Sequence, residues 1–490
     1  MQLEGMKVVR GEEMALVEKR SIVEGASDES YMLKAGEGIA ARVEVFTKEK
    51  NLGKWVTLLV GKGNNGGDAF VAGTFLLHRG FEVEAYHLVD AKECSPLCQK
   101  QAKEFIKAGG RVQKELRLKG VIVDGLLGTG FHGKLEGKIV QVIQKANQSK
   151  LPILAIDIPS GVNGNTGEID PIAIEAKETL YLGMAKLGFF IGAGYDHIGI
   201  LTQVDFEMDP RYVYEAKENG YLINEKILPS LLPPLKRSRH KYQAGYVIAL
   251  AGSPGMPGAA ILSCLGALKT GAGIVRLFHP EGMEGELNSS PYELIRTPYH
   301  WDDPSPILQE EKRAKACLIG PGLGRGEKIG TFLQTLVSKL NLPCVIDADG
   351  LYHLKIFPKG SILTPHHKEM LQLLGKDHLD EKICQTFTEK HEVTLVLKGG
   401  PTWIFHPKKP PLIIPKGDPG MATAGTGDVL TGMIAALLAQ GLRGREAAVL
   451  AVYLHALSGE IAAKKYTSYS LIASDLIEAL PEAFRFLMRA

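Results

Sequence analysis

Short apolar runs, each followed by a loop and an amphipathic stretch, occur in two series along this chain. Continuous apolar runs predict strands buried on both faces, and helices between them predict a parallel sheet that is covered on both sides. The sequence therefore predicts an α/β fold. The strands of the first series are expected at residues 55–60, 81–89, 121–124, 153–157 and 179–182. The strands of the second series are expected at residues 246–251, 274–278, 316–319, 344–347, 361–363 and 394–397.

A polar, irregular connection separates the two series. Asp209-Pro210, Asn219-Gly220 and prolines at 229, 233 and 234 interrupt the alternation there. At 490 residues the chain also exceeds the size of one ordinary hydrophobic core. We therefore expect two α/β domains, over residues 1–215 and 220–490.

Composition and charge indicate which binding partners and which cellular compartment to expect for this chain. A net charge of +2 without a long basic run gives no reason to expect nucleic acid, and the densest positive patch, 236–241, is typical of a solvated face or a nucleotide contact. The first seven residues hold no apolar signal core. The most apolar stretch, 247–275, is interrupted by two prolines and a lysine, which makes it a poor membrane span. We expect a cytoplasmic protein that binds neither nucleic acid nor membrane.

Six cysteines are scattered along the chain. Cys94 and Cys98 have neither a second cysteine pair nor a histidine at the sequence spacing that is typical of zinc sites. We therefore expect six free thiols.

The first candidate site begins where the expected strand 55–60 enters Gly61-Lys62-Gly63-Asn64-Asn65-Gly66-Gly67-Asp68. The glycines satisfy the G-x-G-x-x-G pattern of dinucleotide-binding oxidoreductases. Asp68 argues against that interpretation, because a carboxylate in the first turn of the helix competes with pyrophosphate for the positive end of the helix dipole. The asparagines and Asp68 are better suited to hydroxyl, amide or cation contacts.

Carboxylates follow further strands of the first series. Asp124 and Asp157 each end an expected strand, and the carboxyl ends of parallel strands meet at one edge of a sheet. Together with Asp68, Asn65 and Ser160 they predict an oxygen-rich pocket. Such a pocket can bind a hard cation and still leave one carboxylate for proton transfer. Any one of these aspartates alone is more typical of a helix cap or a loop.

The second candidate site is the run Gly425-Thr426-Gly427-Asp428 before an apolar stretch at 429–438. Glycines at a helix start leave backbone N–H groups uncovered, and those groups together with the helix dipole bind phosphate. Asp428 would be repelled by phosphate, so it needs a role, and activation of an attacking hydroxyl is such a role. The alternative is a tight turn with an acidic helix start.

The motifs of the first half resemble the NAD(P)H-hydrate epimerase family over about residues 10–208. The resemblance is carried by residues 64–68, 123–130 and 157–161, and it implies a Rossmann-like three-layer α/β/α domain. It implies a potassium site of Asn65, Asp124 and Ser160. It implies substrate contacts by Asn64, Asn65, Gly66, Gly67, Asp68, Gly128, Thr129, Gly130, Phe131, His132, Gly133, Lys134 and Asp157. Ala69 and Ala185 depart from the Gly and Pro that are common in the family.

The second half resembles the ribokinase-like superfamily and, within it, the ADP/ATP-dependent NAD(P)H-hydrate dehydratases, over about residues 225–488. The loops at 252–260, 319–324, 346–349, 364–369 and 397–402 carry it, in this order before Asp428. The resemblance implies a ribokinase-like α/β/α domain. It implies substrate contacts by Ala260, Gly322, His366 and Asp428. It implies contacts to the phosphate donor by Lys398, Gly399, Gly400, Pro401, Thr402 and Gly427.

The resemblance also implies a magnesium ion, which Glu369 would contact through a bound water molecule. Asp418 stands where the family commonly has Asn, and His367-Lys368 replace a frequent Pro-Gly. The additional charge of Asp418 is expected to affect nucleotide affinity.

The leading hypothesis is a fused repair enzyme for hydrated NADH and NADPH (NADHX and NADPHX). Asp157 is expected to act in epimerisation with K⁺, and Asp428 in dehydration with Mg²⁺ and ADP or ATP. The resemblance also implies a homo-oligomer. The alternatives are a vitamin or sugar kinase of the ribokinase class that carries an N-terminal ligand-binding module, and a non-catalytic first half on a working second half.

Overall fold

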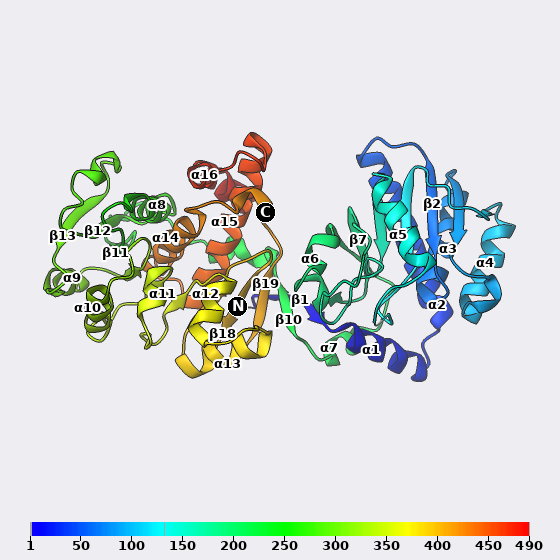
Figure 1. The fold of residues 1–490 in the computed structure, drawn as a ribbon, viewed down its shortest axis with the longest axis horizontal. Helices are drawn as coiled ribbons and strands as arrows, with labels where there is room; N and C mark the ends of the chain where they lie inside the picture. Colours follow the sequence, from blue (N-terminus) through cyan, green and yellow to red (C-terminus); the bar gives the residue numbers. More distant parts are fainter. Residues whose placement is uncertain (1, 132, 490) are drawn as a thin grey trace. The chain divides into compact units, whose positions relative to one another are not determined.

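The computed structural model describes residues 2–131 and 133–489, and the chain divides into two compact units (Figure 1). The first unit is Met6–Gly220, and the second unit is Met1–Gly5 with Tyr221–Ala490. Residues 2–5 group with the second unit because Leu3 is buried in its core and Glu4 forms an ion pair with Arg445 at 2.7 Å. The sequence gives no sign of either contact, so the expected boundaries leave this segment in the first domain.

The first unit is built on a parallel sheet with the strand order β4-β3-β2-β5-β6-β7-β9. All five strands expected from the sequence are present, with ends that differ by at most two residues. The short edge strands β4 and β9 were not expected. Within the same unit, residues 8 and 9 of β1 pair in parallel with β8. The strands are β1 (Glu4–Val9), β2 (Trp55–Val60), β3 (Glu82–His87), β4 (Arg111–Gln113), β5 (Val121–Gly125), β6 (Ile153–Ile156), β7 (Glu178–Leu182), β8 (Ala185–Lys186) and β9 (Ile200–Val204).

Helices cover both faces of this sheet. Along β2, Leu58 belongs to the core beneath α2, α3 and α4, while its neighbour Leu59 belongs to the core beneath α5. Ile122 and Val123 of β5 alternate in the same way, as the period of two in a strand requires. The predicted three-layer α/β/α arrangement is confirmed. The helices are α1 (Gly11–Val23), α2 (Asp28–Glu49), α3 (Asn64–His78), α4 (Pro96–Lys107), α5 (Lys138–Gln148), α6 (Gly194–His197) and α7 (Pro210–Glu215).

The second unit contains a sheet with the order β13-β12-β11-β14-β15-β16-β17-β18-β19-β10. Its strands are parallel from β13 to β17, and β18 and β19 add an antiparallel hairpin that the sequence analysis did not identify. The strands are β10 (Gly220–Ile223), β11 (Tyr246–Leu250), β12 (Ile274–Pro280), β13 (Ile295–Tyr299), β14 (Ala316–Ile319), β15 (Cys344–Ile346), β16 (Ile362–Leu363), β17 (Thr394–Leu397), β18 (Thr402–His406) and β19 (Lys409–Ile414).

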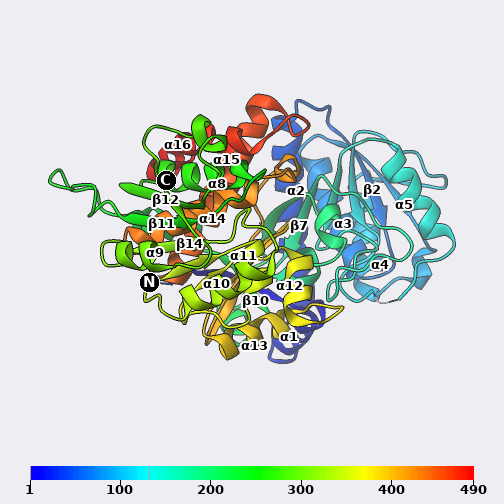
Figure 2. The ribbon, with the colours of Figure 1, turned by 60° about the vertical axis from the view of Figure 1, so that its left-hand side comes forward.

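Four helices of the second unit pack together as one layer, α8, α14, α15 and α16 (Figures 1 and 2). Glycines allow α8 and α14 to approach closely, since a Cβ on Gly432 would lie 1.9 Å from the carbonyl oxygen of Ser263. The helices are α8 (Pro257–Lys269), α9 (Ser305–Glu311), α10 (Glu327–Val337), α11 (Asp349–His353), α12 (His367–Leu374), α13 (Glu381–His391), α14 (Thr426–Ala439), α15 (Gly444–Tyr466) and α16 (Ala473–Arg489).

Helix α15 has the length and the mean hydropathy, 1.2, of a membrane-spanning helix, and among the described residues it alone passes that test. Of its most apolar window, 78% is buried inside the structure. A helix that is apolar on all sides is typical of the interior of a large α/β unit. We therefore assign α15 to the core of the second unit.

Candidate active sites

The first unit contains a cavity of about 500 Å³ at the carboxyl ends of β2, β5 and β6. Residues of α1 and α2 also line it. Of the residues expected at the first site, those that line the cavity are Asn64, Asn65, Asp68, Gly128, Thr129, Gly130, Phe131 and Asp157. His132 lies outside the described residues. Gly133 and Lys134 are described and exposed, and they are not among the lining residues.

The three residues expected to bind potassium lie together, with Asn65 in the lining of this cavity and Asp124 and Ser160 fully buried behind it. Asp124 is fully buried and accepts hydrogen bonds from the backbone N–H of Ser160 at 2.8 Å and from its hydroxyl at 2.7 Å. The hydroxyl of Ser160 accepts in turn from the N–H of Leu127 at 2.9 Å, and Asn65 donates to the carbonyl of Leu127 at 2.6 Å. Burial raises the pKa of Asp124 to about 6, although the bonds from Ser160 oppose the rise.

This arrangement fits a monovalent or hard cation. The donor atoms are carboxylate, hydroxyl, amide and carbonyl oxygens, which are the ligands that hard cations prefer. Within the described residues, Asp124 has hydrogen bonds and no ion pair, so its buried charge has no basic partner there. A bound cation would supply that partner.

Asp157 faces the cavity directly after β6. Its backbone has a φ of 63°, a left-handed conformation that is uncommon for a residue with a side chain and that recurs at functional sites. Its carboxylate accepts from the N–H of Leu182 at 3.1 Å and forms an ion pair with Lys186. Lys186, at the end of β8, is fully buried and also donates to the carbonyl of Leu182 at 2.9 Å.

Two further carboxyls face Asp157 across the cavity. Burial raises the pKa of Glu18 on α1 to about 7, and the charge of Asp157 adds to the rise. Burial likewise raises the pKa of Asp68 well above its ordinary value. Glu18 can therefore take up and release a proton near neutral pH beside the Asp157–Lys186 ion pair, an arrangement that is typical of acid–base catalysis.

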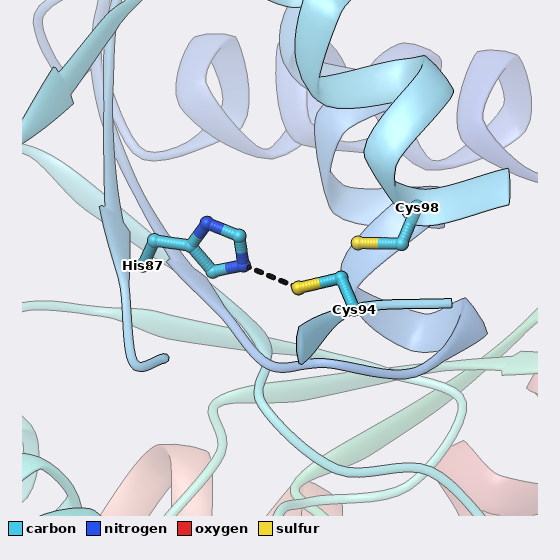
Figure 3. Close-up of side chains that lie close together, drawn as sticks. All are labelled: His87, Cys94 and Cys98. Atoms are coloured by element: carbon cyan, nitrogen blue, oxygen red, sulfur yellow. Dashed lines mark hydrogen bonds between the residues drawn. The ribbon is translucent and has the colours of Figure 1, made fainter. Parts of the chain in front are cut away.

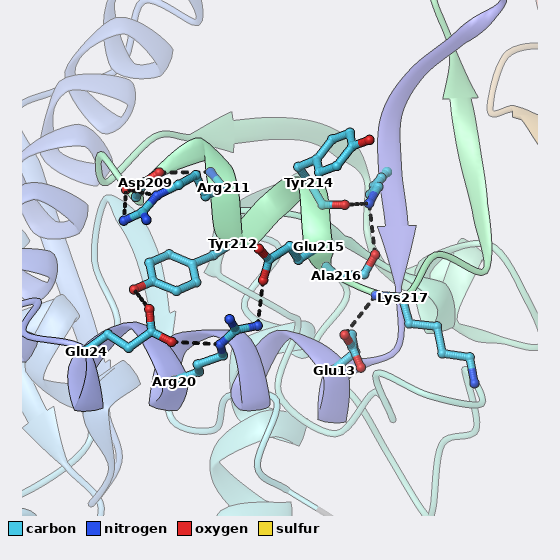
Figure 4. A network of polar contacts seen from close by, with 11 residues as sticks. Glu13, Arg20, Glu24, Asp209, Arg211, Tyr212, Tyr214, Glu215, Ala216 and Lys217 are labelled. Carbon is cyan, nitrogen blue, oxygen red and sulfur yellow. Dashed lines mark hydrogen bonds and ion pairs between the residues drawn. The ribbon is translucent and has the colours of Figure 1, made fainter.

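Glu18 was not identified from the sequence, because it precedes the sheet and its helix carries no motif. A surface network holds α1 against α7 and so places Glu18 (Figure 4). Arg20 pairs with Glu24 at 2.9 Å and with Glu215 at 2.6 Å, and the hydroxyl of Tyr212 donates to Glu24 at 2.8 Å. Exposed pairs contribute little stability individually, so their role here is the orientation of the helix.

Some glycines of the first loop allow close packing, and another leaves the backbone open. A Cβ on Gly66 would lie 2.4 Å from the carbonyl oxygen of Gly61, and a Cβ on Gly67 would lie 2.6 Å from the Met32 side chain. A Cβ on Gly63, in contrast, would meet nothing within 4 Å. Gly66 and Gly67 therefore face inward, and the open position of the loop is Gly63.

In the second unit, Asp428 lies in the first turn of α14, after Gly425 with a φ of 92°. Burial raises the pKa of Asp428 to about 7, the carboxylate of Asp347 adds to the rise, and Lys398 opposes it. Lys398 donates to Asp347 at 2.7 Å, and a Cβ on Gly427 would lie 3.2 Å from the Lys398 ammonium. Asp428, Gly427 and Lys398 are thus brought together, with Asp347 as the member that sequence reasoning did not assign.

The remaining residues expected at the second site follow neighbouring strand ends. His366 caps the N-terminus of α12 by accepting from the N–H of Glu369 at 3.3 Å, and it pairs as an isolated parallel bridge with Lys398. The loop of Lys398, Gly399, Gly400, Pro401 and Thr402 joins β17 to β18. Gly322 has a φ of 66° after β14, and Ala260 is fully buried in α8.

The structure gives Asp418 a local role. Its carboxylate accepts from the N–H of Gly420 at 2.8 Å and from the hydroxyl of Ser468 at 3.0 Å. Asp418 therefore caps the short turn that leads into the Gly425–Asp428 loop.

Comparisons with known proteins agree with this division. A family model described as YjeF-related protein N-terminus matches residues 28–188, and one described as NAD(P)H-hydrate dehydratase matches residues 247–482. A bifunctional NAD(P)H-hydrate repair enzyme from Moorella thermoacetica is 33% identical over 93% of this chain and 92% of its own length. Another, from Dictyoglomus turgidum, is 31% identical over 99% of both chains. A ribokinase-like superfamily protein from Enterococcus faecalis matches 55% of this chain and 96% of its own, with 28% identity and a TM-score of 0.50.

The fold and the two sites define a two-domain α/β enzyme with a ribokinase-like second unit. The chain belongs to the family of bifunctional NAD(P)H-hydrate repair enzymes. The order of the two domains agrees with the resemblances found in the sequence.

Proposed function

We propose that the first unit interconverts the R and S epimers of NADHX and NADPHX, and that the second unit converts the S epimer back to NADH or NADPH with ADP or ATP as phosphate donor. Membership of the repair-enzyme family supports the pairing of activities. The observation that carries the proposal is the position of Asp428 in the first turn of α14, beside Lys398.

In the second unit, Asp428 accepts the proton of the substrate hydroxyl, and the hydroxyl oxygen attacks the terminal phosphorus of the nucleotide. The ammonium of Lys398 follows the charge that develops on the phosphoryl oxygens. Backbone N–H groups at Gly427 and in the 398–402 loop hold the phosphates at the helix start. Magnesium, when bound, offsets phosphate charge, with Glu369 as its outer support. Loss of phosphate, together with a proton from the neighbouring ring carbon, then restores the dihydronicotinamide, since phosphate leaves far more readily than hydroxide.

In the first unit, Asp157 moves protons at the hydroxyl-bearing centre of the nicotinamide. The buried Lys186 keeps the Asp157 carboxylate oriented toward the cavity, and Glu18 is a second proton carrier. Potassium at Asn65, Asp124 and Ser160 would add positive charge beneath the substrate. Residues 64, 65, 68 and 128–131 line the space in which the nucleotide binds.

The decisive test is incubation of the protein with mixed NADHX epimers, magnesium and either ADP or ATP, with measurement of the returning dihydronicotinamide absorbance. Complete recovery supports both activities. A phosphorylated alcohol that accumulates without recovery would instead identify a kinase of the ribokinase class.

The potassium assignment has its own test. Epimerisation should be lost in potassium-free buffer and should return with potassium, because the donor set contains only oxygen and amide groups with one carboxylate. Unchanged epimerisation without potassium, or anomalous scattering from zinc or iron at Asp124, would contradict it.

A further inference from the structure

Three metal-binding side chains of the first unit converge outside the cavity, on the far side of the glycine loop. They are His87 at the end of β3, Cys94 after a short 3-10 turn (Ala91–Glu93), and Cys98 in the first turn of α4 (Figure 3). One ligand atom from each lies within 4.8 Å of the others, and Nε2 of His87 is 3.1 Å from Sγ of Cys94. In the sequence His87 does not stand at a typical zinc spacing from these cysteines, because it lies on a separate strand.

We propose that His87, Cys94 and Cys98 form a binding site for a zinc-class divalent cation. Two thiolates and one imidazole are the ligands that Zn²⁺ prefers. In a tetrahedral zinc site the sulfur and nitrogen ligands are about 3.6 Å apart and two sulfurs about 3.8 Å apart, by the usual Zn–S and Zn–N bond lengths. The observed separations, 3.1 Å between Nε2 of His87 and Sγ of Cys94 and at most 4.8 Å for the other two pairs, bracket these values, so side-chain rotations can bring the three atoms to them.

The surrounding chain holds the three side chains in place without a metal. Ser95 caps α4 by accepting from the N–H of Cys98 at 3.3 Å, and Gln99 donates to the carbonyl of Cys94 at 2.8 Å. The ring of His87 packs edge-on against Phe70 with a centroid separation of 5.5 Å. A preorganised set of this kind needs little ordering when a cation binds.

Burial distinguishes this pair of cysteines from a surface cluster. Cys94 is 6% exposed and Cys98 is fully buried, while His87 is half-buried. The half-buried imidazole therefore marks the side from which a cation enters. Three protein ligands leave the fourth position of a tetrahedral ion to water.

The site also contacts the glycine loop of the epimerase cavity. The N–H of Ser95 donates to the carbonyl of Lys62 at 2.9 Å, and the hydroxyl of Ser95 lies 3.4 Å from Oδ1 of Asn64. Sγ of Cys98 is 3.9 Å from the carbonyl oxygen of Gly61. A cation at Cys94 and Cys98 would therefore brace the segment on which this loop rests.

The test is a titration of the full-length, reduced, metal-free protein with Co²⁺ under anaerobic conditions, followed by displacement with Zn²⁺. We expect thiolate-to-cobalt charge-transfer absorption that saturates at one equivalent per chain and disappears when zinc is added. Cys94→Ser, Cys98→Ser and His87→Asn should each weaken binding by about 100-fold or more, because each removes a ligand. Cys384→Ser, a buried cysteine of the second unit, is the matched control and should bind as the parent does.

Folding of the variants is tested by thermal unfolding without metal. Zinc should then raise the Tm of the parent and of Cys384→Ser, and should leave that of Cys94→Ser unchanged, since only a protein that binds gains stability by mass action. No charge-transfer band in the parent, a band of full strength in Cys94→Ser or Cys98→Ser, or a Cys94–Cys98 disulfide in place of metal binding would overturn the proposal.

Discussion

Asp347 and Lys398 form an ion pair of 2.7 Å between Oδ1 and Nζ, and the other carboxylate oxygen of Asp347 accepts from the hydroxyl of Thr431 at 2.6 Å. Asp347 is almost fully buried after β15, Lys398 directly follows β17, and Thr431 lies one turn along α14 from Asp428. One carboxylate thus ties two strand ends to the helix that carries Asp428. It orients Lys398 and it also raises the pKa of Asp428.

Replacement of Asp428 by Asn should abolish the base while it preserves the shape of the helix start. We expect turnover of the S epimer to fall by about two to four orders of magnitude, the usual contribution of a general base. Nucleotide binding, measured by calorimetry, should change little, because the backbone N–H groups remain. Turnover within a few-fold of the parent would remove Asp428 from the role proposed here.

The pH dependence of dehydration should report the raised pKa of Asp428. The ordinary pKa of the carboxyl lies far below neutrality, whereas burial and the charge of Asp347 raise it to about 7. A base acts only when deprotonated, so kcat/KM should rise with pH up to about 7 and level off above it.

Asp347→Asn tests the cause of this shift. It removes the negative charge that raises the pKa, so the acid limb should move to lower pH even if the rate also falls. Asp377→Asn, at a fully exposed position of the same unit, is the control with an equal change of charge and should leave the limb in place. If the acid limb of the pH–kcat/KM profile kept its parent position in Asp347→Asn, the charge of Asp347 would not be a cause of the raised pKa of Asp428.

Gly66→Ala should destabilise the first unit. The new Cβ would lie 2.4 Å from the carbonyl oxygen of Gly61, and a backbone atom cannot move away without shifting β2. Overpacking of this kind lowers the free energy of unfolding by about 1–3 kcal/mol. Gly63→Ala is the matched control in the same loop, because its Cβ would meet nothing within 4 Å.

The measurement has to resolve the unfolding of one unit. Trp55 is the tryptophan of the first unit, and the other two, Trp301 and Trp403, lie in the second. With both of these replaced by Phe, urea unfolding followed by Trp55 fluorescence reports the first unit alone. Equal unfolding midpoints for Gly66→Ala and Gly63→Ala would show that the contact with the Gly61 carbonyl oxygen does not destabilise the first unit.

The sequence predicted the parts of each site that follow a strand, and missed the parts that depend on pairing. Asp124, Asp157 and Asp428 were identified because a carboxylate after an apolar run or at a helix start has a local signature. Lys186 was given no role, since its contact with Asp157 depends on the position of β8 in the fold. Glu18 carries no motif, and its place at the cavity depends on the packing of α1.

The fold shows the same limit. The central parallel strands were predicted from continuous apolar runs, which are buried on both faces. The hairpin of β18 and β19 was missed because β19 begins with Lys409 and two prolines, which are typical of a loop. This segment forms a strand by pairing antiparallel with β18. The grouping of residues 2–5 with the second unit rests on Leu3 and Glu4, whose partners lie hundreds of residues away.

Asp157→Asn should separate the two activities. Asp157 lies in the first unit and Asp428 in the second, so the loss of one carboxylate leaves the other site intact. The variant should convert pure S epimer, with magnesium and ADP or ATP, at nearly the parent rate. With mixed epimers, recovery should stop once the S form is consumed, apart from slow spontaneous interconversion. Asp196→Asn, on the exposed surface of α6, is the control and should recover both epimers.

Complementation makes this prediction sharper. The Asp428→Asn protein has an intact first unit and no dehydration base, so its addition to stalled Asp157→Asn should restart recovery from the remaining R epimer. The carboxamide leaves the buried Lys186 without a charged partner, so a lower Tm of the first unit is expected as well. If folded Asp157→Asn failed to use pure S epimer, Asp157 would be needed for dehydration, and the assignment of one reaction to each unit would be wrong.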